Sequence, residues 1–309
     1  MSQNKIKSFG GFVVNNRIKT IAICFFSVAI ALVISSVKGF KFGVDFAGGS
    51  VIDFAVTEQD LSVDVMYEKV GNVLPKGSYT LQQQGQERWV CGINKSVEMS
   101  IEEIKTTLSN IFTGIQFLQV ENVGPQVSGS LLKQATWAIV FSFISIVMYM
   151  SVRFNWHLAV SGVIALVLDL LATVSMTSFA SMEINLTVIS AFLTIIGYCV
   201  NDTVVLYDRI RSNIVKSKAK TSDSIASALN SVLRRSILTS VVTLLSLVGM
   251  IIFLDGSIQD FAIIVSFGIV FGTFASLFVS SVLPIFFKME VSDLITKKKV
   301  ERDPEFYAR

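Results

Sequence analysis

Six long apolar segments constrain the fold of this 309-residue chain more than any other feature. A helix needs about 20 mostly apolar residues to cross the roughly 30 Å hydrocarbon core of a bilayer. The segments are Thr20–Val37, Leu132–Val152, Leu158–Phe179, Leu186–Tyr207, Ser236–Leu254 and Phe261–Phe287. Only 16% of the residues are charged, against about 25% in soluble domains, which argues against a water-soluble enzyme. The sequence therefore predicts an α-helical polytopic membrane protein with six transmembrane helices.

The first apolar segment admits two interpretations. With the basic residues before it, it has the charge and hydropathy order of a cleavable signal peptide. However, the run exceeds a typical signal core, and Ser35-Ser36-Val37 is a poor match to the small-residue cleavage site. We therefore favour an uncleaved membrane anchor.

The lysines and arginines predict the orientation, because cytoplasmic connections carry an excess of them. Residues 1–19, the loop 208–235 and the tail 288–309 are rich in basic residues, whereas the connections 180–185 and 255–260 contain none. Both termini are therefore expected in the cytoplasm, and the polar segment 38–129 on the periplasmic side. That segment has 7 basic and 11 acidic residues, which argues against binding to nucleic acid.

The polar segment 38–129 has the periodicity of a small α+β domain. Strands are predicted at Phe42–Val56 (bent at Gly48-Gly49), Tyr79–Gln83, Arg88–Ile93 and Gln116–Val123, and helices at Leu61–Val73 and Ser100–Phe112. Ser100 and Glu103 form a capping box at the start of the second helix. This order is the ferredoxin-like βαββαβ arrangement. It contains no catalytic pattern, so a docking or binding role is expected.

Among the ionisable residues in or next to the apolar segments, three stand out. Asp169 is near the middle of the third, Asp202 is close to the end of the fourth, and Arg235 stands at the start of the fifth. Such residues are costly in a membrane and by default mark a transport path or a proton relay. The alternatives are structural: a neutral, hydrogen-bonded acid at Asp169, and a cytoplasmic anchor at Arg235.

Small and polar residues form stripes on the last three segments. They recur at helical spacing on one face of each segment: Thr187, Ser190, Thr194, Gly197, Tyr198, Asn201 and Asp202; Ser236, Thr239, Ser240, Thr243 and Ser246; Gly268, Gly272, Ser276 and Ser280. Stripes of this kind favour close helix packing, and we interpret the glycine–serine series in that way. The fourth segment also contains Asp202, which favours a functional role for its stripe.

Three motifs resemble those of the SecD/SecF family of protein-export subunits, in the resistance-nodulation-division superfamily. FGVDFAGGS at Phe42–Ser50, which includes Asp45, Gly48 and Gly49, is similar to the sequence after the family's first span. GYCVNDTVVLYDRIR at Gly197–Arg211 resembles the fourth-span signature, and LNSVLRRSILTS at Leu229–Ser240 resembles the entry to the fifth span. The chain departs from the signature at Cys199, usually serine, and at Tyr207, usually phenylalanine.

The resemblance implies an accessory subunit of the Sec translocase in the bacterial inner membrane. It implies pairing with SecD and association with the SecYEG translocon, with YajC as a further partner, and use of the proton-motive force for late, ATP-independent export of preproteins. Asp202 and Arg235 match residues associated with proton passage near the SecD interface, and Asp169 matches a commonly acidic position. Gly197, Asn201 and Thr203 complete the motif, while Asp208 and Arg209 are expected to be interfacial and helix-capping.

Other functions stay open on the residues alone. A half-size proton-coupled permease for a lipid or small hydrophobic substrate is the main alternative, and a scaffold that only stabilises its partner is another. An enzyme comes last, because the single histidine, His157, has no catalytic pattern around it. The separated Cys24, Cys91 and Cys199 predict neither a disulfide nor a metal site, and no cofactor is expected.

Overall fold

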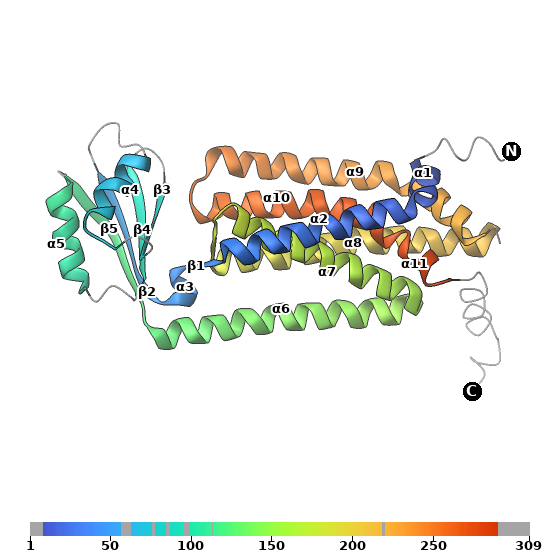
Figure 1. The fold of residues 1–309 in the computed structure, drawn as a ribbon, viewed down its shortest axis with the longest axis horizontal. Helices are drawn as coiled ribbons and strands as arrows, with labels where there is room; N and C mark the ends of the chain where they lie inside the picture. The colour runs from blue at the N-terminus through green and yellow to red at the C-terminus, as the bar shows by residue number, and fades with distance from the viewer. Residues whose placement is uncertain are drawn as a thin grey trace, which may run out of the picture.

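The protein consists of a bundle of long helices with a small α+β domain at one end (Figure 1). A computed structural model describes residues 9–56, 63–75, 78–84, 87–94, 99–112, 114–217 and 220–289. The last described residues of the C-terminal segment and the short helix α1 (Phe9–Asn15) both lie at the end of the bundle opposite the domain. The basic residues before Phe9 and after Met289 lie outside the described residues.

Six helices are long and apolar enough to cross a membrane, which confirms the predicted number of spans. They are α2 (Arg17–Lys38), α6 (Pro125–Arg153), α7 (Trp156–Phe179), α8 (Leu186–Ser217), α9 (Thr221–Phe253) and α10 (Ser257–Ala275). The last continues through a π-helical turn, η1 (Ser276–Ser280), to the short α11 (Leu283–Phe286). Helices α7, α8 and α10 form the interior, and α6 runs along one edge of the bundle (Figure 1).

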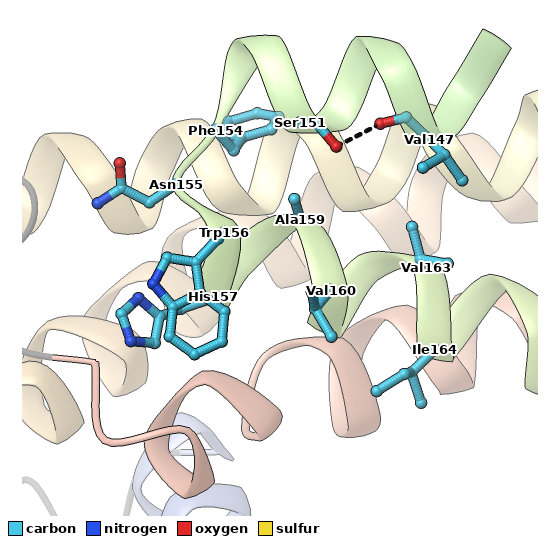
Figure 2. A pocket seen from close by; sticks show the side chains of 10 residues that line it. All are labelled: Val147, Ser151, Phe154, Asn155, Trp156, His157, Ala159, Val160, Val163 and Ile164. Carbon is cyan, nitrogen blue, oxygen red and sulfur yellow. Dashed lines mark hydrogen bonds between the residues drawn. The ribbon is translucent and has the colours of Figure 1, made fainter. Parts of the chain in front are cut away.

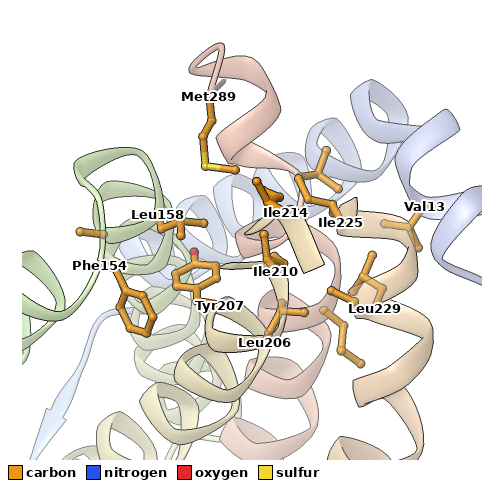
Figure 3. Packing of buried hydrophobic residues seen from close by; sticks show 14 of the residues in the cluster. Val13, Phe154, Leu158, Leu206, Tyr207, Ile210, Ile214, Ile225, Leu229 and Met289 are labelled. Atoms are coloured by element: carbon orange, nitrogen blue, oxygen red, sulfur yellow. The ribbon is translucent and has the colours of Figure 1, made fainter. Parts of the chain in front are cut away.

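The connection 208–235 between the fourth and fifth spans is helical at every described residue except Lys220. Helices α8 and α9 both continue beyond the apolar segments, and residues on their facing sides are fully buried (Figure 3): Leu206, Tyr207, Ile210 and Ile214 on α8, and Ile225, Ala228 and Leu229 on α9. Their three- and four-residue spacing is that of an amphipathic helix. The predicted helix-capping role of Asp208 and Arg209 is therefore wrong, because α8 does not end there.

The α+β domain has the predicted ferredoxin-like topology. Its strands and helices are β2 (Gly49–Val56), α4 (Val63–Gly71), β3 (Tyr79–Gln84), β4 (Arg88–Asn94), α5 (Ile101–Ile111) and β5 (Ile115–Val123). The antiparallel sheet has the order β3-β4-β2-β5, so the first and third strands of the motif lie in the centre. The capping box of α5 is present: the Glu103 amide donates to Ser100 Oγ, and the Ser100 amide donates to Glu103 Oε2.

The predicted strand Phe42–Val56 is divided into three elements. A two-residue strand, β1 (Lys41–Phe42), pairs in parallel with β6 (Glu183–Ile184), and a single helical turn, α3 (Val44–Ala47), follows it. Gly48 and Gly49 have φ values of 72° and 145°, a backbone conformation that other residues rarely adopt. The bend at this pair therefore separates the start of the sheet from the segment that leaves the membrane.

One face of the sheet packs against α4 and α5. Alternate residues of β2, Ile52, Phe54 and Val56, are at most 1% exposed and meet Trp89 and Phe112 in a single apolar core. This alternation follows from the period of two in a strand. The domain thus has its own hydrophobic core, separate from that of the bundle.

Candidate functional site

Asp202 lies inside the bundle at the contact between α8 and α9. Its residue is only 6% exposed, and its side chain makes a hydrogen bond with Ser236 of α9. Its Oδ2 atom has no hydrogen-bond partner among the described residues. The adjacent Arg235 attracts it electrostatically, although the two do not form a direct ion pair in the described part of the chain. A buried acid with one unoccupied oxygen is suited to accept and release a proton.

Asp169 is more deeply buried, at 1% exposure, and it meets α8 one turn away from Asp202. The Cys199 thiol donates a hydrogen bond to its Oδ2 atom, while Oδ1 has no partner among the described residues. Buried polar groups are normally satisfied, so each such exception calls for an explanation. The two acids thus share one property, an unpaired oxygen in the interior, on two different helices.

Glycines of α10 allow α8 to come close to this region. A Cβ atom on Gly272 would lie 2.1 Å from Cys199 Sγ and 2.8 Å from Asp169 Oδ2, and one on Gly268 would lie 2.4 Å from Ile195. Ser276 and Ser280 follow in the π-helical turn, where Ser280 accepts a hydrogen bond from the Tyr207 hydroxyl through its main-chain oxygen. Only glycine fits at position 272 without displacing the acid or the thiol.

A network of hydroxyls holds the three helices together next to Asp202. The Tyr198 hydroxyl donates to Ser240 Oγ over 3.2 Å, and Ser240 Oγ lies 2.8 Å from Thr273 Oγ1. These residues belong to α8, α9 and α10 in turn. Some residues of the polar stripes therefore make contacts between helices, which is the packing role predicted for such stripes.

Several other residues of the polar stripes face outward, together with Arg235. On α8 the exposed residues are Ser190, Thr194, Gly197 and Asn201, and on α9 they are Arg235, Thr239 and Ser246. A Cβ atom on Gly197 would have no neighbour within 4 Å. We call these seven residues the polar seam. Since lipid tails offer no hydrogen bonds, a polar strip on a membrane-embedded surface favours contact with another protein segment.

The signature on α8 is therefore split among three environments. Asn201 lies in the polar seam, Asp202 is buried against α9, and Thr203 is buried near Gly162 of α7, where a Cβ would lie 3.2 Å from Thr203 Cγ2. Successive helical residues point about 100° apart, which explains the split. Further along, Asp208 forms an ion pair with Arg153 of α6 at 2.8 Å, and Arg209 Nε donates to Ser231 Oγ over 3.0 Å.

The motif at Asp45, Gly48 and Gly49 connects the domain to the bundle. Asp45 Oδ2 accepts a hydrogen bond from the Leu186 amide at the start of α8, over 2.9 Å. A Cβ on Gly48 would lie 3.3 Å from Ser128 Oγ at the start of α6. The segment after the first span is thus fixed to two other spans, which explains the motif's residue types at that bend.

Glu183 is a further residue at this junction, and the sequence analysis did not identify it. It lies on β6 beside Lys41, and its side chain makes a hydrogen bond with Thr80 of the domain. Burial raises its pKa, and the nearby Asp260 and Asp45 act in the same direction, against the opposing effects of Thr80 and Lys41. A polar cavity of about 610 Å³ opens between the domain and the bundle at this point. A single glutamate in a connection carries no pattern that predicts such a site.

A second cavity, of about 530 Å³, lies between α6 and α7 near the end opposite the domain (Figure 2). Its lining is mostly apolar, with Val147, Val160 and Ile164 among the residues that Figure 2 labels. His157 is 7% exposed, and its ring lies on that of Trp156 with 3.8 Å between their centroids. The cavity contains no carboxylate, so it is chemically distinct from the two buried acids.

These features define a class of protein: a six-helix membrane protein with a ferredoxin-like domain after its first span and unpaired acids inside its bundle. The chain belongs to the SecD/SecF family. The family model described as "Protein export membrane protein SecD/SecF, C-terminal" matches residues 103–290, and the one described as "SecD/SecF GG Motif" matches residues 33–60.

Individual relatives and solved structures agree with this assignment. The protein translocase subunit SecF of Rickettsia bellii (strain OSU 85-389) is 40% identical over 255 residues, which are 80% of this chain and 84% of that one. The same subunit of Rickettsia rickettsii (strain Sheila Smith) is 40% identical over 273 residues, 85% of this chain and 86% of that one. The crystal structure of SecDF, a translocon-associated membrane protein from Thermus thermophilus, matches with a TM-score of 0.79 and 25% identity over 89% of this chain. This chain spans only 38% of that SecDF chain.

Proposed function

We propose that the chain is an accessory subunit of the Sec preprotein translocase. It is a multi-pass membrane protein of the SecD/SecF family, and its relatives are named as translocase subunits, which agrees with the expectation that it is not an enzyme. We place it in the bacterial inner membrane with both termini in the cytoplasm and the α+β domain in the periplasm. The excess of lysine and arginine in the segments at the end opposite the domain supports this orientation.

We propose SecD as its direct partner, with the SecYEG translocon as the wider assembly and YajC as a further subunit. The polar seam on α8 and α9 supports a second membrane protein at this surface, because the exposed Asn201 and Arg235 are costly against lipid tails. The solved SecDF chain is more than twice as long as the part that this chain matches. A SecD subunit would supply the remaining half of such an assembly.

We propose that Asp202 takes up and releases protons that drive export, with Arg235 as its electrostatic partner and Asp169 as a second acid. The observation that carries this proposal is the unpaired Oδ2 atom of Asp202, buried between α8 and the arginine-bearing α9. A carboxylate that alternates between charged and neutral needs surroundings that change, and helices that rock at a partner interface provide them. One charge crossing 100 mV releases about 2.3 kcal/mol, which biases a two-state motion about fiftyfold.

We propose that α8 also couples the proton site to the α+β domain. The proton site and the domain attachment are both on α8, because Asp45 accepts a hydrogen bond from the Leu186 amide at its start. A shift of α8 relative to α9 would therefore move α3 and the sheet that follows it. We propose that this movement, outside the membrane, acts on the preprotein during late, ATP-independent export.

Export of a secreted reporter tests the proposal in cells whose only copy of the chain carries Asp202→Asn. The proton gradient is left intact or collapsed with a protonophore, and the level of the variant and its retention of SecD are measured. Asp223→Asn, which changes an exposed acid on α9, is the matched control. We expect the gradient-stimulated part of export to be lost in Asp202→Asn and kept in Asp223→Asn. Full stimulation in both variants would show that Asp202 is structural and would favour a scaffold.

A further inference from the structure

Cys199 lies between the two buried acids. It is on α8, three residues before Asp202, and its thiol donates to Oδ2 of Asp169 on α7. Residues three apart on a helix are neighbours on the same face. Cys199 is 5% exposed. Both acids interact electrostatically with its sulfur. Within the described residues, the Cys199 thiol therefore contacts Asp169 and interacts electrostatically with Asp202.

The three groups also lie at successive depths in the bundle. Asp169 is 10 residues before the domain-side end of α7 at Phe179, Cys199 is 13 residues after the start of α8 at Leu186, and Asp202 is 16 residues after it. At about 1.5 Å per residue, they lie roughly 15, 20 and 24 Å from that end of the bundle. The order from the domain side is Asp169, Cys199, Asp202.

The thiol makes the two oxygens of Asp169 unequal. Oδ2 accepts the Cys199 S–H, whereas Oδ1 is buried and has no partner among the described residues. The main-chain oxygen of Asp169 is also occupied, since Thr173 Oγ1 donates to it over 2.9 Å. Gly272 leaves the space that the thiol and Oδ2 fill. A proton that reaches Asp169 has one free oxygen on which to bind.

We propose that Cys199 is a positioning residue for Asp169, a buried acid inside this chain and away from the polar seam. The Cys199 thiol holds Oδ2 and leaves Oδ1 as the atom that takes up the proton. Uptake forms one O–H bond at Oδ1 while the thiol keeps its own proton, and release of the same proton restores the carboxylate. This inference rests on the proposed proton-driven function and adds to it a role for the thiol beside Asp169.

Few other ionisable groups face Asp169, and Arg235 of α9 acts on Asp202. On α2, Cys24 is close enough to Asp169 to interact electrostatically, and on α8 the neighbours are Cys199 and Asp202. On α10 the residue in contact is Gly272, which has no charge. A change in the protonation of Asp169 should therefore be felt mainly by the Cys199 thiol.

Infrared spectroscopy of the thiol tests this directly. The S–H stretching band falls in a spectral window with few other protein bands, and it shifts with the strength of the hydrogen bond that the thiol donates. Cys24→Ala and Cys91→Ala leave Cys199 as the single thiol of the full-length chain, measured in lipid vesicles across a pH series. We expect the band to shift as Asp169 gains its proton, because a neutral acid accepts more weakly than a carboxylate. In Asp169→Asn the band should no longer respond to pH.

Export assays on position 199 provide the second readout. Cys199→Ser keeps a donor and should preserve the pH dependence of gradient-stimulated export. Cys199→Ala removes it, which destabilises the charged form of Asp169, so the midpoint of that pH dependence should rise by about half a pH unit or more. A role in packing alone would change the amount of folded protein in both variants without moving the midpoint.

The outcomes separate this inference from the proposed function. If the S–H band of Cys199 does not shift with pH and has the same position in Asp169→Asn, the proposed role of Cys199 is overturned. This holds even if Asp202→Asn has lost gradient-stimulated export. A band that follows Asp169, combined with an unaffected Asp202→Asn, supports the pairing of thiol and acid but removes its role in proton-driven export.

Discussion

Buried acids have different surroundings in the two regions of this molecule. In the α+β domain, Asp53 is 7% exposed, and both of its oxygens accept hydrogen bonds from the Arg88 guanidinium. In the bundle, Asp169 and Asp202 are buried to a similar degree, yet each keeps one oxygen without a partner among the described residues. The domain thus neutralises its acid with an ion pair, as a structural element does. The bundle leaves its acids open to protonation.

The same contrast extends to the packing. The domain has one continuous apolar core built on Trp89, Phe54 and Phe112. The interior of the bundle contains hydroxyls, a thiol and glycines where α7, α8 and α10 meet. We infer that the domain is built for rigidity, and that the bundle gives up some apolar packing for groups that can change their charge. Four predictions test this difference, from the largest effect to the smallest.

Trp89→Ala should have the largest effect, and it should be confined to the domain. Trp89 is fully buried, and truncation of a buried aromatic residue costs about 3–5 kcal/mol. We expect limited proteolysis to cut the domain at a lower denaturant concentration while the six long helices keep their circular dichroism signal. Equal loss in both regions would show that they fold as one unit.

Gly272→Ala should disturb the bundle and leave the domain intact. The added methyl group overlaps Cys199 Sγ and Asp169 Oδ2, and overpacking of this kind costs about 1–3 kcal/mol. The thermal midpoint of the bundle should fall in detergent. Gly197→Ala is the matched control, because the space beside Gly197 is open; its midpoint should not fall, since alanine is the better helix former. An equal fall in both variants would contradict the close contact at Gly272.

Ser100→Ala should weaken the domain by about 1 kcal/mol, since it removes the side chain that caps α5. Hydrogen exchange of the first amides of α5 measures the effect, with Ser130→Ala on α6 as the control. Unchanged exchange in Ser100→Ala would mean that tertiary contacts alone hold this end of the helix.

Glu183 should make contact between the two regions depend weakly on pH. Burial raises its pKa in the folded protein above the ordinary value of 4.5. Its contribution is therefore fully present below that ordinary value and is lost as the pH rises through the folded pKa. A disulfide crosslink between Gln84→Cys and Gly256→Cys, which are close in space, reports the contact. Crosslinking slows in acid in both chains because less thiolate is present, so we expect the rate relative to that of Glu183→Gln at the same pH to rise toward acidic pH.

The local patterns of the sequence were sufficient to predict the six long helices and the order of strands and helices in the domain. Six apolar segments predicted the six long helices, and alternation in the polar segment predicted the ferredoxin-like domain. The Ser100 and Glu103 capping box was predicted because both partners lie within one helical turn. Two details differed: Phe42–Val56 contains a helical turn where one bent strand was predicted, and Asp208 and Arg209 lie within α8, which continues to Ser217, where a helix cap was expected.

The tertiary structure alone decided how the candidate site is assembled. The sequence placed Asp169, Cys199 and Gly272 on three separate segments, and the contact among them depends on how each helix is rotated and packed. The separation of Asn201, Asp202 and Thr203 into three environments has the same origin. The pairing of β1 with β6 joins residues more than 140 positions apart. Hydropathy and periodicity are properties of neighbours along the chain, whereas these contacts form only when distant segments pack together in space.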